Sequence, residues 1–262
     1  MLNLLIIVLN LSVKNYKVAS ATQQGTSHVK NGNLPCQDIV LADNLNDTVF
    51  LGLADGAGSK VNSQYVAKFI LDALFIELTG NLHFYLKTDD MQMKLTKFIE
   101  SLLYSYAREE RIDFEELAST LLVVVIYEDK YLLLHIGDGL IVSIDEEDKF
   151  KILSLPENGT YANETYFINT IEYKERLRIS HGNINDIRNG LLLCSDGIED
   201  LIYNYQTLEV TPLVKTMIDW LDAESEKHVS EILAYNLENK FSQRSDDDLS
   251  LIIFKESKDE SI

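Results

Sequence analysis

The sequence predicts an α+β fold in which mainly antiparallel sheets are covered by helices. The chain has 262 residues, and 46% of them are hydrophobic, which is enough for a substantial core. Strand-like segments come first, followed by two long helical segments, a long run of strands, two more helices and a last strand. This order lacks the regular strand–helix alternation of a parallel α/β fold.

The strand-like segments are rich in Val, Ile, Leu and Tyr and are bounded by Asp, Asn and Gly, as expected for β-structure. The predicted strands cover residues 16–22, 48–54, 119–127, 131–136, 140–144, 150–155, 165–169, 175–179, 190–194 and 249–254. Apolar residues recur at three- and four-residue steps in the helical segments. The predicted helices cover residues 61–78, 91–109, 211–221 and 224–240.

The chain contains three prolines and shows no internal repeat or Pro/Gly/Ser-rich linker, which favours one domain over residues 14–257. Residues 258–262 form an acidic tail. Residues 1–13 are apolar, but no Lys or Arg precedes them, and the run is too short to span a bilayer. We therefore expect an apolar extension or first strand rather than a secretory signal.

The net charge of −19 argues against nucleic acid or an anionic membrane as a partner, because both require clustered Lys and Arg. Cys36 and Cys194 show neither metal-ligand spacing nor a disulfide framework, which suits a reducing cytoplasm. We expect a cytoplasmic protein. Both cysteines lie in apolar stretches and are interpreted as small buried residues.

Three apolar stretches run directly into Asp-Gly, at Asp55-Gly56, Asp138-Gly139 and Asp196-Gly197. Asp-Gly is typical of a hairpin turn. A predicted helix follows Asp55-Gly56, so the hairpin interpretation fails there. It fits Asp138-Gly139, where the strand 140–144 follows, and is ambiguous for Asp196-Gly197.

A phosphate-binding loop does not fit the first stretch either. Gly52 and Gly58 are too far apart for such a loop, and the order is Gly58-Ser59-Lys60. A carboxylate at the end of an apolar strand, followed by a glycine carbonyl, offers the oxygen ligands that Mg²⁺ and Mn²⁺ prefer. Spacing alone leaves this metal hypothesis and ordinary turn chemistry about equal.

Six motifs together resemble the metal-dependent protein serine/threonine phosphatases (the protein phosphatase 2C family), in particular their compact bacterial branch. The similarity extends in order from about residue 16 to residue 254. The motifs are GTSHVKNGNLPCQD (25–38), GLADGAGS (52–59), STLLVVVI with HIGDG (119–126 and 135–139), YANETYFI (161–168), CSDGIEDL (194–201) and DDLSLIIF (247–254).

The resemblance implies a sandwich of two β-sheets flanked by helices, with two Mn²⁺ or Mg²⁺ ions at one end. It implies that Asp55 bridges both metals and that the Gly56 carbonyl binds the second. Asp196 and Asp247 would complete the first metal site. Asp38 would act largely through metal-bound water.

The resemblance also implies a third, looser metal held by Asp138 and Asp200 together with Asp196. In the implied reaction, a hydroxide that bridges the two metals attacks phosphorus in line, while the cations neutralise the phosphoryl oxygens. No nucleophilic Cys or Ser is required, so Cys194 is interpreted as strand packing.

Three positions depart from the family pattern. Gln37 stands where the eukaryotic members have a metal-binding Glu, and Asn33 stands where they have a phosphate-binding Arg. Ala57 replaces a His that acts as general acid in many relatives. His28 or Lys30 could take over phosphate binding.

The resemblance thus implies a phosphatase of phosphoserine and phosphothreonine in proteins, of bacterial signalling type, opposing a Ser/Thr kinase. We expect a monomer. The alternative is a pseudophosphatase, in which the same fold serves as a binding or regulatory module; the three departures keep it open, whereas the intact carboxylates favour the enzyme. A nucleotide-binding α/β protein is disfavoured by the strand order and by the missing phosphate loop.

Overall fold

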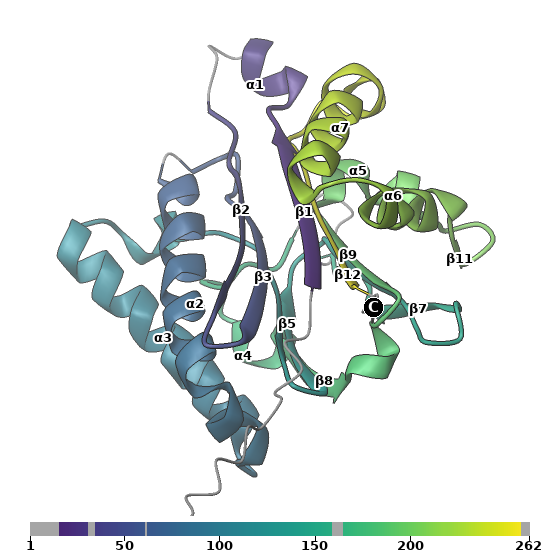
Figure 1. The fold of residues 1–262 in the computed structure, drawn as a ribbon. Helices are drawn as coiled ribbons and strands as arrows, with labels where there is room; N and C mark the ends of the chain where they lie inside the picture. The colour runs from purple at the N-terminus through teal and green to yellow at the C-terminus, as the bar shows by residue number, and fades with distance from the viewer. Residues whose placement is uncertain (1–15, 31–34, 61, 159–164, 258–262) are drawn as a thin grey trace, which may run out of the picture.

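Two five-stranded antiparallel sheets pack face to face in a computed structural model, which describes residues 16–30, 35–60, 62–158 and 165–257 (Figure 1). The predicted extension (1–13) and acidic tail (258–262) lie outside these residues. The first sheet has the order β2 (Asp38–Leu45), β3 (Thr48–Asp55), β4 (Leu121–Tyr127), β5 (Lys130–Ile136) and β8 (Arg178–Asn183). The second has the order β1 (Tyr16–Gln23), β12 (Leu249–Glu256), β9 (Gly190–Cys194), β6 (Leu140–Ile144) and β7 (Phe150–Ser154).

Helices cover both outer faces of the sandwich. The long helices α2 (Ser63–Lys87) and α3 (Met91–Glu110) lie over the first sheet, and α6 (Pro212–Ala223) and α7 (Glu226–Asn239) over the second (Figure 1). The shorter elements are α1 (Thr26–Lys30), α4 (Tyr173–Arg176), α5 (Asp196–Ile202), the hairpin β10–β11 (Tyr203–Asn204 and Glu209–Val210) and the 3₁₀ turns Phe114–Glu116, Ile184–Asp186 and Phe241–Gln243.

The alternation of side chains along each strand divides the core into three apolar layers. In β3, Leu51 and Leu53 point between the sheets, whereas Phe50 and Ala54 pack beneath α2 and α3. In β12, Phe254 points between the sheets and is fully buried. Strands with apolar residues on both faces therefore lie between a facing sheet and a helical layer.

Helix α2 is long and apolar enough to span a membrane by length and composition alone. Its fully buried residues include Val66, Ile70 and Leu74, which recur on one face and belong to the core beneath α2 and α3. The helix also contacts β2, β3 and β4. We therefore interpret its apolar character as core packing.

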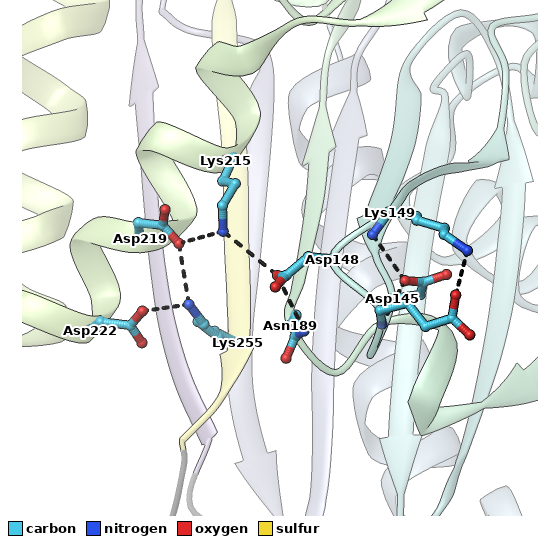
Figure 2. A network of polar contacts seen from close by, with 9 residues as sticks. Asp145, Asp148, Lys149, Asn189, Lys215, Asp219, Asp222 and Lys255 are labelled. Atoms are coloured by element: carbon cyan, nitrogen blue, oxygen red, sulfur yellow. Dashed lines mark hydrogen bonds and ion pairs between the residues drawn. The ribbon is translucent and has the colours of Figure 1, made fainter.

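A network of hydrogen bonds and ion pairs connects α6 to the second sheet (Figure 2). Lys255 Nζ, near the end of β12, lies 2.5 Å from Asp222 Oδ2 and 3.3 Å from Asp219 Oδ1. Asp219 also pairs with Lys215, whose Nζ lies 3.7 Å from Asp148 Oδ1 in the β6–β7 turn. The acidic partners are largely exposed, so we expect only a modest contribution to stability.

Most predicted elements are present, but two predicted strands are wrong. In 165–169, Thr165 makes an isolated bridge with Asn158, and the chain then turns. Ile168 in this segment is fully buried in the core beneath α2 and α3, so its apolar side chain serves packing and not strand pairing. The predicted strand 175–179 spans the end of α4 and the start of β8.

The prediction also missed strand β2, the short hairpin β10–β11 and the short helices α1, α4 and α5, and it made helix α2 too short. Strand β2 was not predicted because its second half, with Asp43 and Asn44, is polar and exposed, as befits an edge strand. Helix α2 continues past the predicted end at residue 78 to Lys87. Gly80 interrupts the sequence pattern there, but tertiary packing of Leu82 and Tyr85 extends the helix.

Candidate metal centre

Five predicted acidic residues lie where strands of both sheets end on one side of the sandwich. Asp38 begins β2 and Asp55 ends β3, and the antiparallel register places the two residues opposite each other. Asp196 follows the end of β9, and Asp247 precedes the start of β12, which pairs antiparallel with β9. Asp138 lies between β5 and β6.

The structure corrects the hairpin interpretation of Asp138-Gly139. Strand β5 pairs with β4 and β8 in the first sheet, whereas β6 pairs with β7 and β9 in the second. The segment between them therefore crosses from one sheet to the other and does not form a hairpin. Gly137 enables the crossing, because its φ of 116° is unfavourable for residues with a side chain.

Carboxylate oxygens of Asp55, Asp138 and Asp196 all lie within 4.8 Å of one another. The three residues come from β3, the sheet-to-sheet crossing and the start of α5, so the cluster exists only in the folded chain. Each is partly buried. Asp247 is exposed, yet its negative charge also acts on all three.

The carboxylates destabilise one another's charged forms. Burial, together with the charges of Asp138, Asp247 and Asp38, raises the pKa of Asp196 to about 8. Burial and the charge of Asp38 raise the pKa of Asp55 well above its ordinary value. Burial raises the pKa of Asp38 to about 6. Such a cluster of like charges is favourable only with protons or cations among the oxygens.

Backbone and hydroxyl contacts hold Asp55 and Gly56 in place. The Asp55 N–H donates to Thr120 Oγ1 at 2.9 Å, and the Thr120 N–H donates to the Asp55 carbonyl at 2.8 Å. The Gly56 N–H donates to the Gln37 carbonyl at 3.2 Å. A Cβ on Gly56 would lie 2.6 Å from the backbone of Ser63, so only glycine fits between β3 and the start of α2.

Two side chains beside the cluster present buried oxygens that lack partners among the described residues. These are both carboxylate oxygens of Asp38 and the amide oxygen of Gln37. The Gln37 amide nitrogen donates to Ser63 Oγ at 2.9 Å and to the Lys60 carbonyl at 3.2 Å, so its orientation is fixed. Unpartnered buried oxygens next to acidic groups are suitable ligands for a hard cation or its water.

Two further predicted site residues are exposed and lie outside the group of three carboxylates. Asp200, in the middle of α5, is exposed and does not belong to the group of three carboxylates. Lys30 is exposed and pairs with Asp246 at 3.3 Å. His28, by contrast, is buried, and its Nε2 lies 4.0 Å from the position that a Cβ on Gly58 would occupy. Asn33 lies outside the described residues.

Sequence reasoning missed three polar neighbours of the centre. Thr165 donates its hydroxyl to Asp138 Oδ2. Burial raises the pKa of Glu199, next to Asp200, to about 7. Asp248 is almost fully buried, although it lies in a run of three aspartates. All three lie in motifs identified from the sequence, and the signal was clearest for Glu199, whose motif contains the two predicted ligands Asp196 and Asp200.

The fold and this cluster define a class of α+β protein: an antiparallel sandwich with a carboxylate centre suited to divalent cations. A family model described as Protein phosphatase 2C matches residues 24–238. The chain belongs to the protein phosphatase 2C family. This match confirms the resemblance based on the six motifs, and with it the assignment as a protein phosphatase.

Solved structures of bacterial phosphatases share the fold. A bacterial serine phosphatase aligns with a TM-score of 0.64 at 16% identity, covering 94% of this chain and 100% of the other. Stp1, a serine/threonine phosphatase from Staphylococcus aureus, aligns with a TM-score of 0.59 at 17% identity, covering 93% and 96%. The catalytic domain of the serine/threonine phosphatase PstP, solved with two manganese ions, aligns with a TM-score of 0.61 at 15% identity, covering 93% and 99%.

A search of curated protein sequences found no match. The structural likeness confirms the predicted fold, a sandwich of two mainly antiparallel sheets flanked by helices.

Proposed function

We propose that this chain removes phosphate from phosphoserine and phosphothreonine in proteins, using two Mn²⁺ or Mg²⁺ ions. The observation that carries the proposal is the convergence of Asp55, Asp138 and Asp196, from three separate segments, to within 4.8 Å. Family membership supports the reaction class. The manganese ions of PstP belong to that protein, and the acidic cluster supports the same use here.

The residues present fit divalent cations. Asp55 would contribute its carboxylate to both ions, and the Gly56 carbonyl would contribute to the second. Asp196 and Asp247 would complete the first. Asp138, with Asp196 and Asp200, would hold a third, more loosely bound ion. Bound divalent cations supply Lewis-acid stabilisation of the phosphoryl oxygens and lower the pKa of water.

Side chains beside the cluster would then position water and substrate. Asp38 faces Asp55 across the end of the sheet, and its buried, unpartnered oxygens can accept hydrogen bonds from water. Burial raises the pKa of the Cys194 thiol and also that of the Cys36 thiol. Both thiols are therefore protonated at neutral pH, and neither supplies a thiolate nucleophile. The proposed route is direct attack by water, as the resemblance to the family implies.

His28 is the better of the two candidates for phosphate binding. It is buried near Gly58 of the loop that follows Asp55, whereas Lys30 is turned toward Asp246 at the surface. We further propose a cytoplasmic, monomeric enzyme, with residues 14–257 as one domain, that opposes a Ser/Thr kinase or acts on that kinase's target. The net charge of −19 supports an acidic protein without affinity for nucleic acid.

The test is hydrolysis of p-nitrophenyl phosphate and of a phosphothreonine peptide, with Mn²⁺ or with EDTA. We expect Mn²⁺-dependent turnover by the wild type and its loss in Asp196→Asn. Asp72→Asn is the matched control, because Asp72 is a half-exposed aspartate of α2 paired with Lys68. Absence of turnover on both substrates, with Mn²⁺ still bound, would refute the enzyme and favour a binding module.

A further inference from the structure

One buried carboxylate, that of Asp248, joins the segments that carry the proposed metal ligands. Asp248 is 2% exposed. Its Oδ1 accepts a hydrogen bond from the Gly25 N–H at 2.6 Å, and its Oδ2 accepts one from the Gln37 N–H at 2.6 Å. His28 Nδ1 lies 3.2 Å from Oδ1. The carboxylate therefore binds the backbone of the loop before α1 and of the residue before β2, and it lies within contact distance of the buried histidine of α1.

The backbone of Asp248 contacts two more ligand segments. Its N–H donates to Asp247 Oδ1 at 2.8 Å and thereby fixes the orientation of that side chain. A Cβ on Gly197 would lie 2.2 Å from the Asp248 carbonyl oxygen, so the start of α5, which begins at Asp196, packs directly on Asp248. The same residue thus touches the neighbours of two proposed ligands of the first metal.

Gln37 links Asp248 to Gly56, the proposed ligand of the second metal. Its N–H is held by Asp248, its carbonyl accepts the Gly56 N–H at 3.2 Å, and Asp38 is the next residue along the chain. A shift of the Asp248 carboxylate would therefore displace Asp38 and the proposed ligand Gly56 relative to the ligands Asp196 and Asp247. Asp246, two residues earlier, is exposed, and among the described residues its side chain bonds to Thr26 and Lys30 of α1.

We propose that Asp248 is a positioning residue of the metal centre, which sets the spacing between Asp38, the Asp55-Gly56 pair, Asp196 and Asp247. The proposal rests on the proposed function, in that the cluster binds divalent cations. In Asp248→Asn the side chain keeps its size, but its NH₂ group faces one of the two backbone N–H donors, so one hydrogen bond is replaced by a donor–donor contact.

The test is direct titration of the full-length, metal-free protein with Mn²⁺ by calorimetry, without substrate, for the wild type, Asp248→Asn and Asp246→Asn. Loss of an outer partner of metal ligands weakens metal binding by roughly 10–100-fold, and we expect this for Asp248→Asn. Asp246→Asn should bind Mn²⁺ as the wild type does. An Asp248→Asn affinity equal to wild type, or an equal loss in Asp246→Asn, would overturn the proposal.

A purely architectural role would lower the melting temperature without changing Mn²⁺ affinity or the Mn²⁺ EPR spectrum, in which neighbouring ions couple magnetically. We expect loss of that coupling in Asp248→Asn at two equivalents of Mn²⁺ and its recovery at high Mn²⁺. If Asp248→Asn does not fold without metal, His28→Gln is the second variant, because it alters the contact between His28 and the Asp248 carboxylate. We expect it to lower Mn²⁺ affinity by about 2–10-fold. Unchanged Mn²⁺ binding there would count against the proposal. Because no turnover is measured, failure of the phosphatase activity and failure of this inference are distinguishable.

Discussion

Removal of one carboxylate from the centre should stabilise the metal-free protein. Two unit charges 4.8 Å apart repel by about 3 kcal/mol at an effective dielectric constant of 20. Asp196 lies within that distance of both Asp55 and Asp138. Partial protonation already relieves part of this repulsion in the wild type. We therefore expect Asp196→Asn to raise the free energy of unfolding in EDTA at pH 8 by about 1–3 kcal/mol.

The stabilisation by Asp196→Asn should be larger at pH 8 than at pH 5. The folded-state pKa of Asp196 is raised to about 8, so between about pH 4 and pH 8 the folded protein holds more protons than the unfolded chain. The metal-free wild type therefore loses stability as the pH rises through this window. At pH 5, Asp196 is already protonated in the folded state, so the substitution by Asn should have little effect.

Thermal unfolding followed by circular dichroism at pH 5 and pH 8, with EDTA, measures both effects. For a chain of this size, 1 kcal/mol corresponds to roughly 2–4 °C in melting temperature. With Mn²⁺ the order should reverse, because the wild type gains the free energy of metal binding. The control Asp72→Asn, at a half-exposed position, should stay within about 0.5 kcal/mol of the wild type under all conditions. An Asp196→Asn protein no more stable than wild type at pH 8, or a gain of equal size at pH 5, would refute the electrostatic explanation.

Three substitutions test the fold. Gly80→Ala should stabilise the protein by about 0.5–1 kcal/mol in urea unfolding, because Gly80 lies within α2 and a Cβ there has no neighbour within 4 Å; a loss of stability would contradict a helix through this glycine. Gly197→Ala should destabilise by more than about 2 kcal/mol in the same assay, since its Cβ would lie 2.2 Å from the Asp248 carbonyl oxygen; wild-type stability would show that α5 can move off β12. Phe254→Ala should cost about 3–5 kcal/mol by removing a fully buried ring between the sheets, and a loss below 1 kcal/mol would mean that the sandwich interior is not close-packed there.

The fold class and most element positions could be predicted from the sequence because the core signals are local. Continuous apolar runs bounded by Asp, Asn and Gly mark strands such as β3 and β9, and the three- and four-residue spacing marks α3. Where burial comes from tertiary packing, these signals mislead. Ile168 is apolar because it fills the core beneath two helices, and Leu82 and Tyr85 keep α2 helical beyond Gly80.

The site could be predicted in part, for the same physical reason. Asp55, Asp138 and Asp196 each follow an apolar strand or precede one, so their positions at sheet ends follow from the pattern. That all three belong to one cluster does not, because the crossing of residues 137–139 between sheets is a long-range property. A local turn signal at Asp138-Gly139 is compatible with either a hairpin or a crossing, and only the pairing partners of β5 and β6 decide between them.

Asp248 shows the limit most clearly. In the sequence it is one of three consecutive aspartates in a chain with 42 acidic residues, and composition offers no reason to separate it from its neighbours. In the structure, Asp246 is exposed, Asp247 is exposed beside the cluster, and Asp248 is buried against the backbones of Gly25 and Gln37. Strand β12, which follows directly, pairs with β1 in a defined register that begins with Leu249 opposite Gln23. Because successive residues next to this strand point in different directions, each aspartate lies in a different environment. Three identical residues thus acquire three different roles: solvated surface, proposed metal ligand and proposed positioning group.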